Sequence, residues 1–249
     1  MKEFNLLSEK HCLITGGSRG LGLAMCIAFA KEGAKIAFTY SNDDEDAEDA
    51  KVLISKAGSN PLIFKGSVAN INHVQETVKD LYSRWGKIDV LVNNAAINQI
   101  IPFALLEEED WDSLMNINLK GTYLYTRTVL KYMIRHKSGN ILNIGSFASE
   151  RFVESPIHYA TSKSAIRGFT ESLALEVGKH NIRVNLLSPG LLTEGMSKMV
   201  PQGRLKDYIE QNSLYRLGTL EEIAKMACFL VSDKNTFMTG AKVVLDGGL

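Results

Sequence analysis

Short apolar runs and longer amphipathic stretches alternate along nearly the whole chain. The runs have the length of buried strands, whereas the stretches between them repeat their apolar positions with helical spacing. Strands are predicted at 12–15, 35–40, 62–65, 89–93, 140–146, 183–188 and 242–245. Helices are predicted at 23–33, from the acidic run 43–49 onward, and at 71–85, 107–136, 157–180 and 219–232.

This alternation predicts the fold class α/β: a single-domain, Rossmann-type, doubly wound parallel sheet of about seven strands in three α/β/α layers. The 249 residues suit one large core, and no internal repeat or linker divides them. We therefore expect one domain over residues 1–249. Residues 191–214 mix polar and helical patches, which is typical of a mobile flap beside a binding site.

Composition and charge exclude several classes of function. Apolar residues make up 45% and charged residues 22%, as in an ordinary globular protein. The 28 basic and 28 acidic residues cancel, so no long-range field attracts nucleic acid or an anionic membrane. The first 14 residues carry charges on both sides of a very short apolar patch, unlike a signal peptide or a membrane span. We expect a cytoplasmic protein without nucleic-acid or membrane partners.

Neither the cysteines nor the histidines have the spacing of metal ligands. Cys12, Cys26 and Cys228 lie in apolar segments, where small buried side chains are expected and a disulfide framework is not. His158 adjoins a tyrosine, but neighbours on a helix point in different directions, so His158 is expected to line the site or lie on the surface. No metal site is expected from the five histidines, which are His11, His73, His136, His158 and His180.

A glycine-rich turn, TGGSRGLG at 15–22, stands between the first predicted strand and the first predicted helix. In this context such a turn binds the pyrophosphate of a dinucleotide at the helix N-terminus. Gly16 permits the tight turn, Gly20 lets the backbone approach phosphate, and Gly22 allows close packing of helix on strand. The alternative is a purely structural turn.

The end of the second predicted strand bears on the choice between NAD and NADP. Folds that prefer NAD place an acidic side chain there for the ribose 2′-hydroxyl, whereas a basic residue nearby suits a 2′-phosphate. This strand ends in Tyr40, Ser41 and Asn42 without a carboxylate, and Arg19 could reach a phosphate. The sequence therefore favours NADP. The acidic run 43–49 would repel a phosphate if it faced inward, but we expect the solvated first turn of a helix there.

Ser146, Tyr159 and Lys163 form the candidate acid–base group. Tyr159 and Lys163 are four residues apart, which places them one turn apart on the same face of a helix. An unperturbed tyrosine has a pKa of about 10, and a neighbouring cation is expected to lower the pKa of Tyr159. Ser146 follows an apolar run, so its hydroxyl is expected at the carboxyl end of a strand, where ligands of open α/β sheets bind. The structural alternative is a half-buried ring beside a solvated ammonium.

Other polar segments are expected near the same edge. Asn93 and Asn94 precede Ala95 and Ala96 at the end of the fourth predicted strand, and these small residues leave room for a flat ring or a ribose. The alternative for the two asparagines is a turn that braces its own backbone. Asn118 stands beside an apolar helical stripe, so its side chain must be satisfied or used.

Six ordered matches resemble the short-chain dehydrogenase/reductase family over essentially the whole chain. They are TGGSRGLG, the NNAA stretch, Asn118 in NINLKG, Ser146 in NIGS, YATSK, and the pair Pro189 and Gly190 with Thr193. The phrases GFTESLALEVGKHNIRVN and TGAKVVLDGG are similar to the 3-oxoacyl-[acyl-carrier-protein] reductase branch. The resemblance implies the reduction of a ketone, with the hydride supplied by a nicotinamide cofactor.

The resemblance also implies roles for four catalytic residues. Ser146 would bind the substrate carbonyl, Tyr159 would donate the proton, and Lys163 would lower the pKa of the tyrosine while holding the nicotinamide ribose. Asn118 would hold a water that links Lys163 to solvent. Contacts to the cofactor, NADP(H) in preference to NAD(H), are implied for Gly16, Ser18, Arg19, Gly20, Leu21, Gly22, Tyr40, Ser41, Ser67, Val68, Asn94, Ala95, Ala96, Tyr159, Lys163, Pro189, Gly190, Leu192 and Thr193.

Three residues depart from the family pattern. Ala96 replaces a glycine, and Ser67 replaces the aspartate beside the adenine. Arg135 and Lys137 could meet an acyl carrier protein, but Leu175 stands where an arginine is usual, which leaves the carrier-protein partner open. The family commonly forms tetramers, so a homotetramer is implied.

Three hypotheses about function follow. The leading one is an NADP-dependent ketoreductase that acts on a ketone, most simply a 3-oxoacyl thioester. A second is a dehydrogenase of a sugar, a steroid or another small alcohol on the same residues. A third, from another class, is a nucleotide-sensing binding protein without turnover, which would not need all four catalytic residues.

Overall fold

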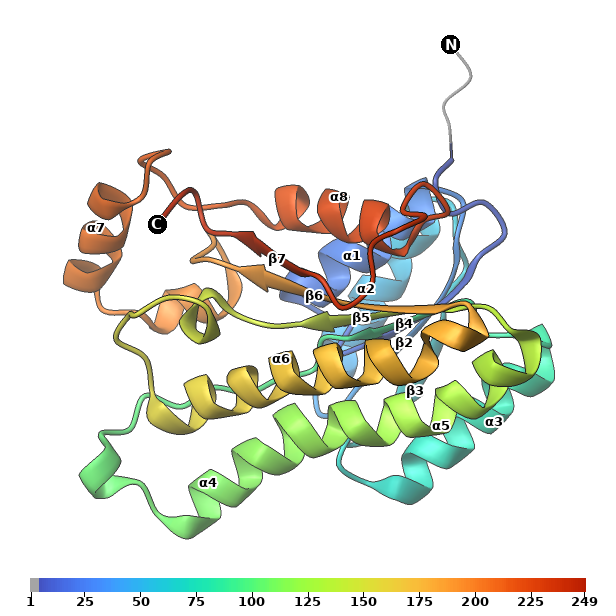
Figure 1. Cartoon of the computed structure of the whole chain (residues 1–249), viewed down its shortest axis with the longest axis horizontal. Coiled ribbons are helices and arrows are strands. Elements are labelled where there is room, and N and C mark those ends of the chain that lie inside the picture. The colour runs from blue at the N-terminus through green and yellow to red at the C-terminus, as the bar shows by residue number, and fades with distance from the viewer. Residues whose placement is uncertain (1–4) are drawn as a thin grey trace.

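The computed structural model describes residues 5–249, with Met196 described by its backbone alone. Within these residues, seven parallel strands form one sheet in the order β3-β2-β1-β4-β5-β6-β7 (Figure 1). The α/β sheet expected from the alternating pattern is thereby confirmed. The strands are β1 (His11–Thr15), β2 (Lys35–Tyr40), β3 (Leu62–Lys65), β4 (Val90–Asn93), β5 (Gly139–Ile144), β6 (Ile182–Pro189) and β7 (Lys242–Leu245).

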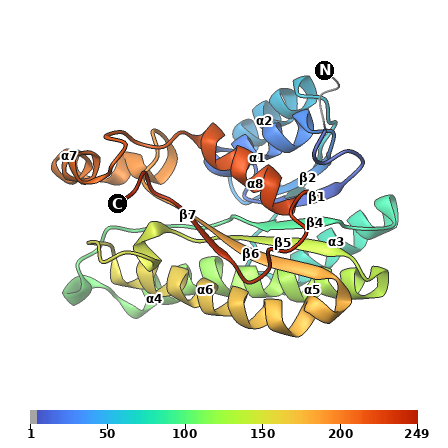
Figure 2. The ribbon, with the colours of Figure 1, turned by 45° about the horizontal axis from the view of Figure 1, so that its top comes forward.

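Helices cover both faces of the sheet and complete three layers (Figure 2). One face carries α1 (Gly20–Lys31), α2 (Asp44–Lys56) and α8 (Leu220–Val231). The other face carries α3 (Ile71–Trp85), α4 (Glu108–Met115), α5 (Gly121–His136) and α6 (Ile157–Val177). The short helix α7 (Gln202–Gln211) lies to one side, beyond the end of the sheet.

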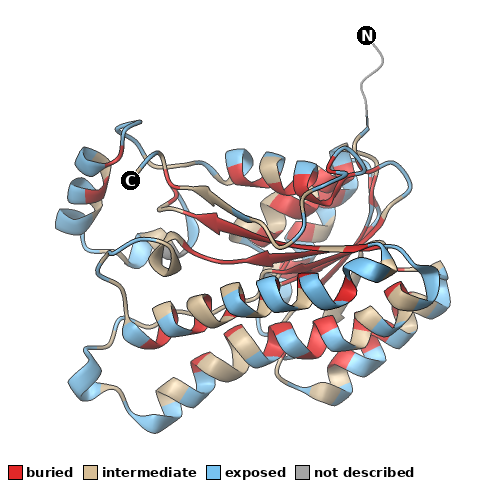
Figure 3. Cartoon of the chain, in the orientation of Figure 1, coloured by how far each residue is buried: buried red, intermediate tan, exposed pale blue. Residues whose placement is uncertain are grey.

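The core explains why the central strands read as continuous apolar runs. Successive side chains of β1 point to opposite faces, so Cys12 and Ile14 join a cluster with α1 and α8, while Leu13 joins a second cluster with α3 and α5. Figure 3 shows burial along the strands and on the inward sides of the helices. Cys12, Cys26 and Cys228 are buried free thiols, as expected.

The helix predicted at 107–136 differs in its winding. A π-helical turn, Asn116–Lys120, lies between α4 and α5 while the backbone stays helical at both junctions. Such turns insert one extra residue and are frequent at functional sites. The turn contains Asn118, which the apolar periodicity alone had placed on an uninterrupted helix.

Side chains cap the starts of two helices. Asp43 caps α2 by accepting a hydrogen bond from the Asp46 backbone N–H, so the acidic run is the first turn of that helix, as expected. Thr219 and Glu222 form the reciprocal capping box of α8.

The sheet order places a crevice at one edge. Strand β1 pairs with β2 on one side and with β4 on the other, so the chain winds outward in both directions from this point. In open α/β sheets the ligand crevice lies at the carboxyl ends of the strands at this topological switch point.

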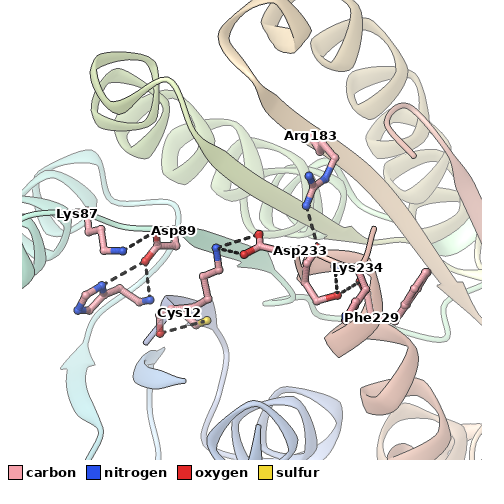
Figure 4. A network of polar contacts seen from close by, with 10 residues as sticks. Cys12, Lys87, Asp89, Arg183, Phe229, Asp233 and Lys234 are labelled. Carbon is pink, nitrogen blue, oxygen red and sulfur yellow. Dashed lines mark hydrogen bonds and ion pairs between the residues drawn. The ribbon is translucent and has the colours of Figure 1, made fainter. Parts of the chain in front are cut away.

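The opposite, amino edge of the sheet carries a network of paired charges (Figure 4). The carboxylate of Asp89 accepts a hydrogen bond from the His11 backbone N–H at 2.9 Å. It also lies 3.2 Å from Nδ1 of the His11 ring and 3.1 Å from Nζ of Lys87. Lys10 pairs with Asp233 at 2.8 Å, which ties the start of β1 to the segment after α8. The contacts His11–Asp89 and Lys10–Asp233 join segments that are distant in sequence.

Within residues 5–249, no helix combines the length and the apolar character that crossing a membrane requires. The prediction for the first 14 residues falls partly on residues 1–4, which lie outside the described residues.

Candidate active site

A cleft of about 1430 Å³ opens at the carboxyl edge of the sheet. The glycine-rich turn, the ends of β4 and β5, the start of α6 and the segment that contains α7 all contribute to its lining. Every cofactor contact implied by the sequence resemblance lines this cleft except Thr193. Of the four candidate catalytic residues, Ser146, Tyr159 and Lys163 line it and Asn118 does not.

The glycine-rich turn requires glycine for two different reasons. Gly16 and Gly20 have φ angles of +66° and +54°, which residues with a side chain rarely adopt. A Cβ on Gly22 would lie 2.0 Å from the carbonyl oxygen of Gly16, so α1 could not pack against β1. Gly17, which the sequence did not single out, meets the same limit, since its Cβ would lie 2.4 Å from Cβ of Phe38.

The two asparagines at the end of β4 bind neighbouring segments rather than their own turn. Nδ2 of Asn94 donates to the carbonyl oxygens of Thr15 and Gly16 at 2.9 and 3.0 Å, which fixes the glycine-rich turn. Nδ2 of Asn93 donates to Asn143 Oδ1 at 2.8 Å and to Thr126 Oγ1 at 2.9 Å. The predicted alternative, a turn that braces its own backbone, is wrong for both residues.

Tyr159 and Lys163 lie on one face of α6, and both are buried. Nζ of Lys163 donates to the carbonyl oxygen of Ile144 at 2.8 Å and lies 5.7 Å from the centre of the Tyr159 ring. Burial lowers the pKa of Lys163 to about 8, because the charged form loses its hydration. The ammonium thus faces a strand-end carbonyl and the phenol together.

The pKa of Tyr159 is shifted in the direction opposite to the expected lowering. Burial raises the pKa of Tyr159, and hydrogen bonding by Ser146 lowers it by a smaller amount. The prediction was wrong because it counted the cation and left out the cost of burying a phenolate. A tyrosine of raised pKa is fully protonated at neutral pH, which is the form a proton donor requires.

Neighbouring groups hold the side chain of Asn118 in place. Its Oδ1 accepts from the Ile97 backbone N–H at 2.8 Å, and its Nδ2 donates to the Ile97 carbonyl at 3.0 Å and to Ser162 Oγ at 3.1 Å. The side chain therefore holds the segment after β4 against α6, behind the cleft. Thr193 is exposed, and its backbone N–H donates to the Gly218 carbonyl at 2.9 Å.

At the far end of the cleft, two cationic side chains lie close to carboxylates of α2. Asp44 accepts from the Tyr40 hydroxyl and from Nζ of Lys65, each at 2.7 Å. Nη1 of Arg19 lies 3.7 Å from a carboxylate oxygen of Asp46, and the Arg19 side chain is 79% exposed. The hydrogen bond to Asp44 raises the pKa of Tyr40 to about 12. Lys65 was missed because only the pairing of β2 with β3 places it beside Tyr40.

His158 is fully buried, which corrects the prediction of a lining or surface position. His158 lies on α6, which packs on α4. Among the described residues, neither ring nitrogen has a hydrogen-bond partner. Burial lowers the pKa of His158, while the nearby Asp110 acts in the opposite direction. His158 therefore lies within the packing around α6 and not in the lining of the cleft.

At the mouth of the cleft, α7 contacts the segment after Ser146. The hydroxyl of Tyr208 on α7 donates a hydrogen bond to the Asp246 carbonyl at 2.8 Å. The centres of the Tyr208 and Phe147 rings lie 5.4 Å apart in an edge-to-face arrangement. Arg204 of α7 pairs with Glu154 across the mouth. No short motif announces these residues in the sequence. Exposed apolar side chains also line the mouth: Ile100, Phe103, Phe152, Ile157 and Met199.

Comparisons with known proteins agree with this geometry. A family model described as enoyl-(acyl carrier protein) reductase matches residues 16–249. The structure of a short-chain dehydrogenase/reductase from Serratia marcescens superposes with a TM-score of 0.90 at 30% identity, over 98% of each chain. The chain belongs to the short-chain dehydrogenase/reductase family.

Within the short-chain dehydrogenase/reductase family, relatives named for different activities are similar to this chain. The 3-oxoacyl-[acyl-carrier-protein] reductase of Thermotoga maritima is 35% identical over 246 residues, which are 98% of each protein. The structure of an NAD+-bound xylitol dehydrogenase has a TM-score of 0.92 at 30% identity and covers 99% of this chain and 100% of that one. The chain is thus an oxidoreductase of a family that uses NAD or NADP.

The glycine-rich turn fits the pyrophosphate of such a cofactor. A Cβ on Gly20 would meet no atom within 4 Å, so the backbone at the start of α1 opens directly onto the cleft. The N-terminus of a helix favours an anion there. Among the described residues, no group of three His, Cys, Asp or Glu side chains is arranged to hold a metal ion.

Proposed function

We propose that this oxidoreductase reduces a ketone to a secondary alcohol with NADPH, and that its substrate is a 3-oxoacyl thioester. The single observation that carries this proposal is the juxtaposition of Ser146, Tyr159 and Lys163 in a cleft beside the glycine-rich turn. The similarity to the 3-oxoacyl-[acyl-carrier-protein] reductase of Thermotoga maritima supports the substrate class. The apolar mouth of the cleft suits an acyl chain, since burying each methylene group contributes about 0.8 kcal/mol.

The three residues divide the proton chemistry between them. Oγ of Ser146 accepts a hydrogen bond from the Ala148 N–H at 3.2 Å, which orients the hydroxyl, and its own proton would be donated to the substrate carbonyl. Tyr159 donates its proton to the developing alkoxide, and Lys163 stabilises the phenolate that remains. When bound, the nicotinamide supplies the hydride. Asn118 positions α6 and, as the resemblance implies, holds the water that links Lys163 to solvent.

We also propose that NADP(H) is preferred over NAD(H). Among residues 40–42 no carboxylate is present to accept the ribose 2′-hydroxyl, and Asp43 is occupied as the cap of α2. Arg19 is the candidate ligand of the 2′-phosphate, with Lys65 as a second cation nearby. The carboxylates of Asp44 and Asp46 compete for these two cations, so the preference depends on how easily the exposed pairs exchange.

In this proposal the chain acts as one domain, with residues 191–214 as a flap over the substrate. This segment contains a 3-10 turn, Gly195–Met199, and α7, and both line the mouth of the cleft. A homotetramer is carried over from the family as a prediction. Leu175 is 88% exposed and offers no charge to a carrier protein, so the free thioester is the substrate form to test first.

The alternative substrate class is a small polyol or another alcohol. Its support is the similarity to the xylitol dehydrogenase structure. The exposed apolar rim favours the thioester, because a polyol would leave that rim in contact with water.

NADPH oxidation, followed by absorbance with an acetoacetyl thioester and with NADH in a parallel reaction, tests the proposal. We expect turnover with NADPH and at least tenfold less with NADH. Turnover only with xylitol-like alcohols and NAD would contradict both the proposed substrate and the proposed cofactor. Tight NADPH binding without turnover of any ketone or alcohol would favour the nucleotide-sensing alternative.

A further inference from the structure

The segment that follows Ser146 is a tight turn that fixes the serine from both sides. A 3-10 turn, Phe147–Ser149, begins immediately after Ser146. The Ser146 carbonyl accepts from the backbone N–H of Ser149 at 3.0 Å and from its hydroxyl at 2.7 Å. The Ala148 N–H donates to the serine hydroxyl, so three hydrogen bonds connect Ser146 to this turn. A shift of the turn therefore moves the Ser146 hydroxyl.

The next residue, Glu150, places a carboxylate that is only 7% exposed against two cations. Its Oε2 lies 3.7 Å from Nη1 of Arg167 on α6 and 3.8 Å from Nζ of Lys242 on β7. The Ser149 hydroxyl is 3.2 Å from the same carboxylate, and Arg167 also donates to the Ser149 carbonyl at 3.2 Å. The turn is thus attached to the helix that carries Tyr159 and to the last strand.

Arg151 attaches the turn a second time. Its Nε donates at 2.8 Å to the carboxylate of Asp246, just after β7, and that carboxylate is 5% exposed. The other oxygen of Asp246 accepts from the Gly248 N–H at 3.0 Å. The carbonyl oxygen of Asp246 accepts from Tyr208 of the flap helix at 2.8 Å. Asp246 therefore contacts both the turn after the serine and the flap.

The burial of the two carboxylates distinguishes this brace from ordinary surface ion pairs. An exposed pair contributes little, because water solvates each partner alone. A buried carboxylate that loses its partner stays desolvated, so the neighbouring backbone must move to restore contacts with water. The exposed side of the brace is Arg151, whose side chain is 43% exposed and can be changed without opening the core.

We propose that Glu150 and Arg151 are positioning residues that hold Ser146 in place for the reaction, through a brace to Asp246 that the flap helix shares. The inference rests on the proposed role of Ser146 in binding the substrate carbonyl. A displacement of about 1 Å at a reacting group can cost roughly 100-fold in rate. Breaking the brace should therefore lower kcat and leave cofactor binding intact.

The test compares Arg151→Met, Arg151→Lys and the isosteric Glu150→Gln with the wild type. We expect Arg151→Met to lower kcat by about 10- to 100-fold, with the Kd of NADPH, from its fluorescence, within twofold. Arg151→Lys should recover part of the lost kcat, and Glu150→Gln should show a smaller loss. The matched control is Arg84→Met, because Arg84 pairs with Asp80 on the exposed side of α3.

Hydrogen exchange supplies a readout that does not depend on turnover. We expect Arg151→Met to accelerate amide exchange at 146–151 by tenfold or more, with no change elsewhere in the sheet and none in Arg84→Met. Wild-type exchange and wild-type kcat in Arg151→Met would overturn the brace. A wild type that turns over no ketone would overturn the proposed function, while the exchange measurement would still decide whether the brace holds Ser146.

Discussion

Charged side chains have different kinds of partner at the two edges of the sheet. At the amino edge, Lys10 and Lys87 each face a carboxylate within 3.1 Å (Figure 4). At the carboxyl edge, the buried ammonium of Lys163 faces the carbonyl oxygen of Ile144, and no ion pair is found for it among the described residues. The pKa of Lys163 falls to about 8 as a result of burial.

The difference separates stability from chemistry within one framework. At the amino edge, the contacts Lys10–Asp233 and His11–Asp89 tie distant segments together. A buried ammonium held by a neutral oxygen costs stability, but its proton equilibrium lies close to physiological pH. Buried polar groups without a charged partner tend to mark functional sites, whereas charges that are fully paired tend to stabilise the structure.

The largest effect is expected at the carboxyl edge, from Tyr159→Phe. The substitution removes one hydroxyl from a buried ring, so kcat for ketone reduction should fall about 10²- to 10⁴-fold, the contribution of a general acid. The Kd of NADPH and the melting temperature should stay close to the wild-type values. Steady-state kinetics together with thermal unfolding checks both halves of this prediction. Near-normal kcat in a folded, NADPH-binding variant would remove Tyr159 from the role of proton donor.

The second effect concerns pH and should set the alkaline limit of activity. Because the pKa of Lys163 is about 8, its ammonium is present below that pH and is lost as the pH rises through it. The pKa of Tyr159 is raised above its ordinary value of 10, so the phenol keeps its proton across this range. We expect kcat/KM for NADPH, which reports the free enzyme, to fall up to tenfold per pH unit above about 8.

A Lys163→Arg variant identifies the group behind this limb. Arginine stays charged in proteins, so any residual activity of the variant should lose its alkaline limb near pH 8. A limb that remains at the same pH in Lys163→Arg would assign the ionisation to another group.

The elements around this site could largely be predicted from the sequence. Ser146 was placed at a strand end by the apolar run before it, and Tyr159 and Lys163 were placed on one helix face by their spacing. These are local regularities of strands and helices, which a single sequence carries. The capping box of α8 and the acidic first turn of α2 are local in the same sense.

Features that depend on tertiary contacts could not be predicted. The carbonyl partner of Lys163 and the cross-strand neighbour Lys65 both require the pairing of strands. The burial of His158 requires the packing of α6 on α4, and the π-helical turn at Asn118 satisfies that side chain with the backbone of Ile97. In each case the deciding partner is more than 15 residues away or on a neighbouring element.

A smaller effect is expected at the amino edge, and on stability alone. Asp89→Asn weakens its contacts with His11 and Lys87, so the free energy of unfolding should fall by about 1–3 kcal/mol. Urea denaturation measures this change, while kcat should stay within twofold of the wild-type value, because the network lies at the opposite edge from the cleft. A loss of kcat without a loss of stability would show that the two edges are not separate.

The smallest effect is expected at the exposed end of the cleft, where charge is paired but solvated. Arg19→Met removes the candidate ligand of the 2′-phosphate, so the Kd of NADPH should rise about tenfold, as for one charge-assisted hydrogen bond, and the Kd of NADH should change less than twofold. Asp44→Asn should act in the opposite direction by about twofold, because it releases Lys65 from a pair that water already weakens. Lys51→Met, which breaks an exposed pair within α2, is the matched control. Equal effects of Arg19→Met on NADPH and NADH would show that Arg19 serves the pyrophosphate, and the preference for NADP would then need another source.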